Sequence, residues 1–165
     1  MPYSHHNFDL PGFDLGQFID ATLNEDLGTG QPGGGRDVTA DSVIPATARF
    51  AGVTVSRDAI VVAGLPVACA FFTALDDEIE VELLARDGQQ VPAGTVLMRL
   101  RGNARALLTA ERSALNTLQH LSGIATLTRR YVDAIQAAGA FTAVLAAVSL
   151  IVDNFESLSK FVAGI

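Results

Sequence analysis

Residues 96–121 read VLMRLRGNARALLTAERSALNTLQHL, and the spacing of their apolar side chains changes near the middle. Val96, Met98 and Leu100 recur at every second position, which is the period of a strand buried on one face. Beyond Asn103 the period becomes helical, and Asn103 itself is a preferred type of N-cap residue. The buried arc of this predicted helix consists of five leucines: Leu107, Leu108, Leu115, Leu118 and Leu121.

The segments before residue 96 predict further strands and two more helices. One helix is expected over residues 14–27 with Asp14 as its N-cap, and another over residues 66–75 with proline in its first turn. Strands are predicted at residues 49–56, 59–63 and 79–83. Together these elements predict an antiparallel sheet covered by one or two helices, which is an α+β open sandwich domain. We assign it residues 1–110, of which residues 1–13 are expected to be a loose arm.

The segment after the leucine-rich helix predicts a second unit. The Ser122–Gly123 pair is expected to interrupt the helix, and a new helix is predicted over residues 124–138. A buried strand over residues 144–152 and a short helix over residues 156–162 complete a strand–loop–helix pattern. Residues 111–165 are therefore predicted to form an incomplete α/β barrel domain, since a whole barrel takes about 250 residues.

The composition is that of a globular chain, with 49% hydrophobic and 18% charged residues. A net charge of −7 argues against nucleic acid as a general partner. The only cysteine, Cys69, lies in an apolar run, which excludes a disulfide within the chain and favours a buried thiol. The longest apolar stretch, residues 140–152, is too short to span a bilayer, and the N-terminus shows no secretory pattern. A cytoplasmic protein without a membrane partner is therefore predicted.

Basic residues are concentrated in one segment of this acidic chain. Between Arg99 and Arg130 lie six of the eleven lysine and arginine residues and a single acid, Glu111. At about 100° per residue, one narrow stripe of the predicted helix carries five polar side chains: Arg105, Thr109, Arg112, Asn116 and His120. The stripe contains no carboxylate, and arginine forks bind carboxylates and phosphates through two nitrogens at once. We predict an anion site, with a solvated basic helix face as the alternative.

Several short motifs lie in order along the chain. In chain order they are EDLG (25–28), DVT (37–39), ERSALN (111–116) and LSGIAT (121–126). They resemble the patterns E-D-x-G, G-D-x-T, E-R-x-A-L-N and L-S-G-I-A-T of one enzyme family, the quinolinate phosphoribosyltransferases. Residues 31–35 are an insertion between the first two motifs, and Arg36 stands in place of the glycine before DVT. The resemblance covers roughly residues 14–138.

The resemblance implies transfer of the phosphoribosyl group of phosphoribosyl pyrophosphate to quinolinate, with decarboxylation to nicotinate mononucleotide for NAD synthesis. It also implies an α/β sandwich followed by an α/β barrel, in a homodimer where the arginine of E-R-x-A-L-N reaches the neighbour's active site. That arginine is Arg112, which would hold a quinolinate carboxylate. Arg105, Asn116 and His120 of the stripe are predicted to bind substrate beside it. Asp153 resembles the aspartate of a late L-D-N motif and is the candidate Mg²⁺ ligand, and no catalytic residue is assigned.

The sequence departs from the family pattern after Gly139. The family's D-T-R-K-T strand, a later lysine and an H-R pair have no counterpart, because Lys160 is the only lysine and no arginine follows Arg130. The 55 residues from 111 to 165 are too few to close a barrel, so we expect negligible turnover by this polypeptide. The alternatives are a non-catalytic dimerising fragment and a related protein linked to molybdenum transport. The turn at residues 87–94 also resembles half of a biotinyl or lipoyl domain, but it lacks the lysine that a carrier needs.

Overall fold

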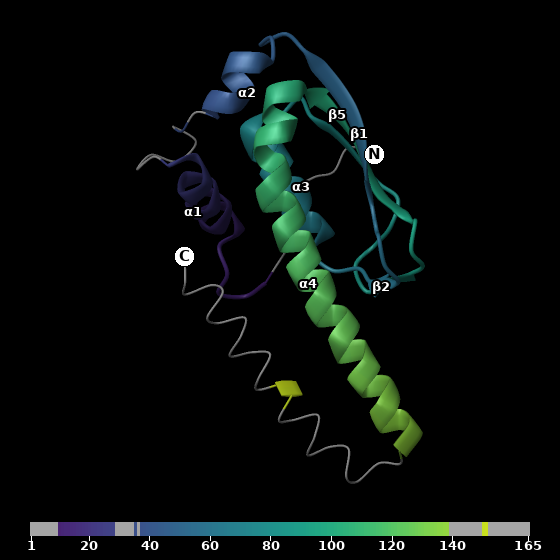
Figure 1. The fold of residues 1–165 in the computed structure, drawn as a ribbon. Helices are drawn as coiled ribbons and strands as arrows, with labels where there is room; N and C mark the ends of the chain where they lie inside the picture. The colour runs from purple at the N-terminus through teal and green to yellow at the C-terminus, as the bar shows by residue number, and fades with distance from the viewer. Residues whose placement is uncertain (1–9, 29–34, 36, 139–149, 152–165) are drawn as a thin grey trace.

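The computed structural model describes residues 10–28, 35, 37–138 and 150–151 (Figure 1). Four helices and five strands are assigned within these residues. The helices are α1 (Leu15–Leu27), α2 (Val38–Val43), α3 (Leu65–Leu75) and α4 (Ala104–Ala138). The strands are β1 (Arg49–Val55), β2 (Ile60–Val61), β3 (Glu80–Leu83), β4 (Gln90–Val91) and β5 (Val96–Asn103).

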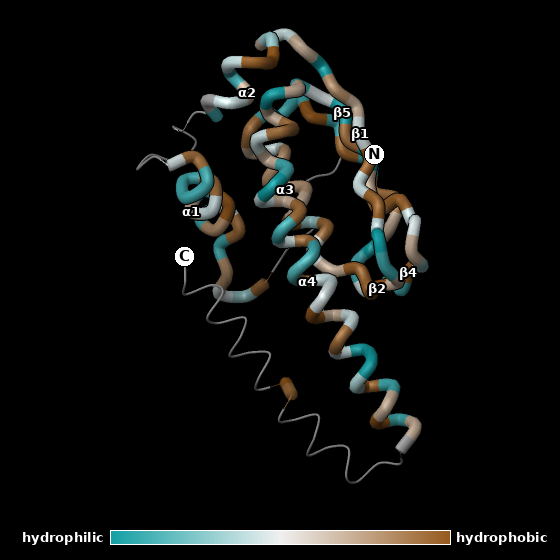
Figure 2. The backbone as a smooth tube through the Cα atoms, in the orientation of Figure 1, coloured by the Kyte–Doolittle hydropathy of each residue, from teal (hydrophilic) through white to brown (hydrophobic). Residues whose placement is uncertain are grey.

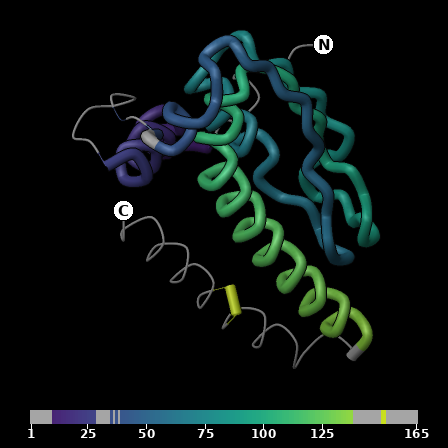
Figure 3. Tube along the Cα trace, turned by 45° about the horizontal axis from the view of Figure 1, so that its top comes forward, coloured from purple at the N-terminus to yellow at the C-terminus, as the bar shows by residue number. Residues whose placement is uncertain are grey.

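The strands form two small antiparallel sheets, one with the order β1-β5-β3 and one that pairs β2 with β4. The central strand β5 is the one predicted at residues 96–101, and it runs directly into α4. Helices α3 and α4 cover one face of the larger sheet, which gives the mixed α/β sandwich expected from the sequence (Figure 1). The C-terminal half of α4 extends beyond the sheet (Figure 3).

The register of the larger sheet separates an inner apolar face from an outer charged face. Val81 lies opposite Leu100 on the inner face, whereas Glu82 lies opposite Arg99 on the outer face. Arg99 Nη1 lies 2.9 Å from Glu82 Oε2, and both side chains are more than half exposed. Along β3 and β5 the outer face is therefore a solvated ladder of opposite charges, the arrangement that the alternation at residues 79–83 predicts. On the β1 side of Arg99 the same face carries the exposed apolar residue Val53.

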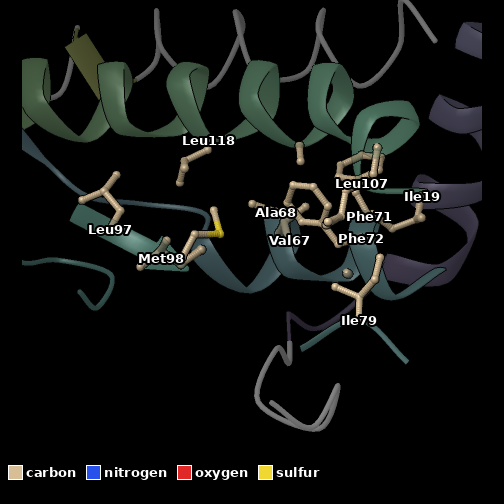
Figure 4. Close-up of a cluster of buried hydrophobic side chains, with 14 of the residues drawn as sticks. Ile19, Val67, Ala68, Phe71, Phe72, Ile79, Leu97, Met98, Leu107 and Leu118 are labelled. Atoms are coloured by element: carbon tan, nitrogen blue, oxygen red, sulfur yellow. The ribbon is translucent and has the colours of Figure 1, made fainter. Parts of the chain in front are cut away.

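Helix α3 is the centre of the hydrophobic core, because its sequence LPVACAFFTAL leaves almost no polar side. Phe71 and Phe72 are 0% and 1% exposed and pack beneath α4 with Ile19 of α1 (Figure 4). Cys69 is also completely buried, which confirms the prediction of a structural thiol. Burial, together with the nearby negative charge of Asp87, raises the pKa of the Cys69 thiol to about 12.

The predicted helix ends are confirmed where side chains cap them. The Asp14 carboxylate accepts a hydrogen bond from the Gln17 backbone N–H, and α1 ends at Gly28 with a φ of 69°. Asn103 Oδ1 accepts from the backbone N–H groups of Arg105 and Ala106, as expected of an N-cap.

The amino end of α3 is capped from a distant part of the chain. Gly64 precedes the helix with a φ of 94°, and Asp87 accepts from the backbone N–H groups of Gly64 and Leu65 at 2.9 and 3.0 Å. The proline expected in the first turn, Pro66, follows Leu65. The Asp87–Gly88 turn therefore connects the β3–β4 region to the start of α3.

Helix α4 is continuous from Ala104 to Ala138, so the predicted interruption at Ser122–Gly123 is wrong. A glycine inside a helix costs about 1 kcal/mol relative to alanine, which a long and well-packed helix tolerates. Ser122 Oγ accepts from the backbone N–H of Ala63, and Thr126 Oγ1 accepts from that of Val61. These contacts tie the helix to the β2 segment on both sides of Gly123.

Two other predictions change in the structure, and one helix is new. Leu108 is 43% exposed rather than buried, since Leu107 beside it takes the core position. Leu150 and Ile151 are helical, so the predicted strand at residues 144–152 is wrong there, and its other residues lie outside the described part. The short helix α2 was not predicted.

Hydrophobic and hydrophilic residues alternate along the whole of α4 (Figure 2). The boundary predicted between residues 110 and 111 lies inside this helix, and Ala114 and Leu118 beyond it still belong to the hydrophobic core. The division into two domains stays a prediction. No described helix is both long enough and apolar enough to cross a membrane.

Candidate anion-binding site

The polar stripe predicted from the sequence lies on α4, and acidic residues from the first third of the chain contact it. Its members are Arg105, Thr109, Arg112, Asn116 and His120. Because all five belong to one continuous helix, their spacing of three or four residues keeps them on one side. The carboxylates that contact the stripe belong to Asp26 at the end of α1, to Asp37 before α2, and to Asp41 within α2.

Arg105 is bound to the α2 region through three nitrogens. Nε donates to the backbone carbonyl of Ile44 at 2.7 Å, Nη1 to Asp41 Oδ1 at 2.9 Å, and Nη2 to the Asp41 carbonyl at 3.0 Å. Side-chain exposure is 29% for Arg105 and 25% for Asp41. The sequence argument that the stripe lacks carboxylate partners is therefore wrong, because the partner lies 64 residues earlier.

We expect Arg105→Ala to lower the free energy of unfolding by about 2 kcal/mol, because Asp41 and two backbone carbonyls would lose a charged donor. Arg105→Lys should recover little of this loss, since an ammonium cannot reproduce the planar fork. Urea unfolding measures both effects. The matched control is Arg99→Ala, whose ion pair with Glu82 is exposed and should contribute less than about 1 kcal/mol. Equal losses at Arg99 and Arg105 would contradict a structural role for Arg105.

Asp37 joins the start of α2 to the same stripe. Its Oδ1 accepts from the Ala40 backbone N–H at 2.9 Å and caps α2, while Oδ2 accepts from Thr109 Oγ1 at 3.2 Å. Asp37 is the aspartate of the DVT motif, so this motif forms a helix cap that is attached to α4.

Asp26, the aspartate of the EDLG motif, lies beside Arg112. Ser113 Oγ donates a hydrogen bond to Asp26 Oδ2, and Asp26 Oδ1 lies 3.8 Å from Arg112 Nε. The Arg112 side chain is 78% exposed, whereas that of Asp26 is 25% exposed. Arg112 therefore keeps most of its guanidinium in solvent, in contrast to Arg105.

Asn116 and His120 follow Arg112 on the same side of α4, one and two turns along. Asn116 is exposed and His120 is half-buried. Of the four predicted substrate-binding residues, the structure thus brings Arg112 and Asn116 together at an open surface and places Arg105 in an internal contact. Their roles in substrate binding stay predictions.

Asp153, the predicted Mg²⁺ ligand, lies outside the described residues. Within the described part of the chain, no three histidine, cysteine, aspartate or glutamate side chains gather closely enough to hold a metal ion. The described residues therefore do not fit a magnesium site, and no chemical step is assigned to one.

The LSGIAT motif has a structural role that the sequence did not reveal. Ser122 Oγ accepts from the Ala63 N–H at 3.1 Å, and Thr126 Oγ1 accepts from the Val61 N–H at 2.8 Å. The two hydroxyls are four residues apart, so they lie on one side of α4 and satisfy backbone groups of the β2 segment. A serine and a threonine four residues apart on the predicted helix were the signal in the sequence that could have revealed this role.

A cavity of about 810 Å³ lies between β1 and α4, away from the stripe. Its lining includes Phe50, Val53, Leu108, Leu115 and Gln119, but none of the four predicted substrate-binding residues. The four predicted substrate-binding residues thus lie apart from this cavity.

Comparison with known families identifies the region that carries the stripe. Residues 37–122 match the family model described as quinolinate phosphoribosyl transferase, N-terminal domain. This range begins at Asp37 and ends at Ser122, so it contains α2, α3, all five strands and the stripe.

Curated relatives and solved structures show the same similarity. A probable nicotinate-nucleotide pyrophosphorylase [carboxylating] from Synechocystis is 51% identical over 81 residues, which are 49% of this chain and 28% of the relative. The chloroplastic nicotinate-nucleotide pyrophosphorylase [carboxylating] of Arabidopsis thaliana is 36% identical over 75% of this chain and 34% of the relative. The crystal structure of NadC from Streptococcus pyogenes superposes with a TM-score of 0.70 at 32% identity, covering 79% of this chain and 44% of that chain. The chain thus spans about a third of the length of the curated relatives it matches.

Proposed function

Because the chain belongs to the quinolinate phosphoribosyl transferase family, we propose that it serves quinolinate phosphoribosyl transfer and that Arg112 binds a quinolinate carboxylate. The reaction takes the phosphoribosyl group from phosphoribosyl pyrophosphate and releases CO₂, which gives nicotinate mononucleotide. The part of this reaction that we assign to the described residues is a substrate-binding surface on α4.

One observation carries this proposal, namely the different surroundings of the two arginines in the stripe. Arg105 is held by three hydrogen bonds to Asp41 and Ile44, whereas the Arg112 side chain is 78% exposed. A planar guanidinium can bind a carboxylate through two parallel N–H groups. Arg112 lies within the region that matches the family, so it is the arginine of this stripe that can receive a dicarboxylate.

Asn116 extends the proposed binding surface. It lies four residues after Arg112, so its side chain is one turn along the same face and is also exposed. Its amide can donate to a second carboxylate oxygen of quinolinate or to a phosphate oxygen of the co-substrate. We include His120 as a further substrate contact on the same face. We assign Arg105 a structural role, because its hydrogen bonds hold α2 against α4.

We propose that the working form is a homodimer in which Arg112 of one subunit faces the active site of the other. An exposed arginine that binds substrate weakly alone is suited to such a shared site, because exposed ion pairs contribute about 1 kcal/mol or less. Magnesium would accompany phosphoribosyl pyrophosphate, and its predicted ligand Asp153 remains a prediction. The predicted cytoplasmic location likewise stays a prediction.

The test of Arg112 is a calorimetric titration of the chain with quinolinate at low salt. We expect Arg112→Ala to weaken binding about fivefold, and Arg112→Lys to weaken it nearly as much because the two-nitrogen fork is lost. Arg129→Ala is the matched control, since Arg129 is an exposed arginine on the same helix with a carboxylate neighbour, Asp133. Equal affinities of the wild type and the Arg112 variants would reject the proposal.

A second measurement separates catalysis from binding alone. Incubation with quinolinate, phosphoribosyl pyrophosphate and Mg²⁺ should be followed by detection of nicotinate mononucleotide, while light scattering reports the oligomeric state with and without quinolinate. A dimer that binds quinolinate without forming product would favour the non-catalytic dimerising fragment. Steady product formation would show that the polypeptide itself turns over and would overturn the expectation of negligible activity.

A further inference from the structure

We propose that Asp26 and Ser113 are positioning residues that hold the Arg112 guanidinium in the orientation needed to receive a carboxylate. The inference rests on the proposed role of Arg112 in quinolinate binding. Asp26 belongs to the end of α1, whereas Ser113 and Arg112 are neighbours on α4. The three side chains therefore form a bridge between two helices, in which Asp26 and Ser113 are 87 residues apart in sequence.

The two oxygens of the Asp26 carboxylate have different partners. Oδ2 accepts the hydrogen bond from Ser113 Oγ, and Oδ1 lies 3.8 Å from Arg112 Nε. Ser113 is only 2% exposed, so its hydroxyl is fixed by the surrounding helix packing. A carboxylate that is held through one oxygen presents its other oxygen to the arginine in a defined direction.

The backbone that carries Asp26 is fixed as well. Leu23 and Ile19, one and two turns earlier on α1, are 2% and 3% exposed and belong to the hydrophobic core. Gly28 ends the helix two residues later, and its backbone N–H donates to the Asn24 carbonyl at 2.9 Å. Asp26 is therefore attached to a packed helix, and the bridge to α4 does not depend on a free loop.

This arrangement leaves part of the guanidinium for a ligand. The ion pair joins Asp26 to the Nε side of Arg112, so the edge formed by Nη1 and Nη2 is the one that we assign to a substrate carboxylate. Fixing a long side chain before binding reduces the conformational entropy lost when the ligand arrives. The negative charge of Asp26 acts in the opposite direction, since it repels an anionic ligand.

These two effects predict changes of opposite sign when Asp26 is replaced. If positioning dominates, Asp26→Ala weakens quinolinate binding. If charge repulsion dominates, the same variant binds quinolinate more tightly. Ser113→Ala keeps the Asp26 charge and removes only the hydrogen bond that orients it, so it isolates the positioning effect.

The binding arm of the test measures the dissociation constant for quinolinate in the full chain. We expect Asp26→Ala and Ser113→Ala each to weaken binding about three- to fivefold, and the double variant to be no weaker than either single one. Asp133→Ala is the matched control, because it also removes a carboxylate near an α4 arginine and raises the net charge by one. Unchanged or tighter binding by both Asp26→Ala and Ser113→Ala would overturn the proposal.

The second arm observes Arg112 without any ligand. In the ¹⁵N-labelled chain, the Nε–Hε signal of Arg112 is assigned by its loss in Arg112→Lys, and its order parameter is measured by relaxation. We expect the order parameter to fall by about half in Asp26→Ala and Ser113→Ala while the far-ultraviolet circular dichroism spectrum stays that of the wild type. An unchanged order parameter in both variants would overturn positioning, whatever the binding result.

The two arms distinguish the two possible failures. One outcome is that quinolinate binding is independent of Arg112 while the Nε–Hε order parameter depends on Asp26 and Ser113. In that case the proposed function is wrong, and the positioning of Arg112 by Asp26 and Ser113 is correct. If quinolinate binding depends on Arg112 but neither replacement affects the affinity or the order parameter, the proposed function stands and positioning fails.

Discussion

Replacing Gly64 by alanine is expected to lower the free energy of unfolding by about 2–4 kcal/mol. Gly64 has a φ of 94°, a backbone conformation that disfavours any residue with a Cβ. A Cβ at this position would also lie 2.6 Å from Leu121 Cδ1 and 3.3 Å from Leu121 Cβ. The close approach occurs where the start of α3 meets α4, one residue beyond His120 of the stripe, so the variant should also disturb the helix that carries Arg112.

The backbone and crowding contributions can be separated with two further variants. Gly88→Ala is the matched control, because Gly88 has a φ of 80° but nothing within 4 Å of its added Cβ. It should lose only the backbone part, about 1–2 kcal/mol. Leu121→Ala in the Gly64→Ala background should restore part of the loss by removing the crowded side chain. Urea denaturation followed by circular dichroism measures the stability of all three variants. Equal losses of stability at Gly64 and Gly88 would show that Leu121 moves away from the added Cβ at no cost in free energy.

Phe71→Ala is expected to lower the free energy of unfolding by about 3–5 kcal/mol, because it removes a large side chain from the centre of the core. Phe71 is 0% exposed, and its ring lies 6.0 Å from that of Phe18 in an edge-to-face arrangement. The loss of the ring leaves a cavity among α1, α3 and α4, the helices that hold Asp26, Cys69 and Arg112.

The control for Phe71 is Phe50→Ala on strand β1, since that side chain is 52% exposed. It should reduce stability by less than about 1 kcal/mol, because most of its surface is already in water. Calorimetric melting temperatures and urea midpoints of the two variants test the difference. A Phe71→Ala chain as stable as Phe50→Ala would mean that the core assigned to α3 is wrong.

Local patterns correctly predicted those helices and strands that depend mainly on interactions between residues close together in the sequence. The alternation of Val96, Met98 and Leu100 gave β5, and the cap at Asn103 gave the start of α4. The six-residue helix α2 was not predicted, because six residues are too few to show a periodic pattern. It is held by the Asp37 cap and by Arg105, which is a contact across 64 residues.

The candidate site shows the same division between local and distant interactions. A helical projection placed Arg105 and Arg112 on one side of α4 but could not reveal that only Arg105 has a closely bound carboxylate partner, because Asp41 belongs to another helix. The projection also treated Gly123 as an interruption, since it could not include the bonds from Ser122 and Thr126 to the β2 segment. That the Arg112 side chain is exposed could be learned only from the structure.

The EDLG and DVT motifs acquire a physical explanation from these contacts. Asp26 reaches Ser113 and Arg112, while Asp37 reaches Thr109, so both motifs attach the first third of the chain to α4. The insertion between the two motifs, residues 31–35, therefore falls between two points of attachment. Each aspartate sits at a helix terminus, where its backbone position is well defined.

The buried thiol of Cys69 makes the chain convenient for site-specific labelling. With a pKa of about 12, only about one thiol in 10⁵ is ionised at pH 7, and the thiolate is the form that reacts with maleimides. Since Cys69 is the chain's only cysteine, a single cysteine introduced at an exposed position of α4 would carry a fluorophore or spin label alone. Distances across the proposed dimer could then be measured in a chain that keeps its native core.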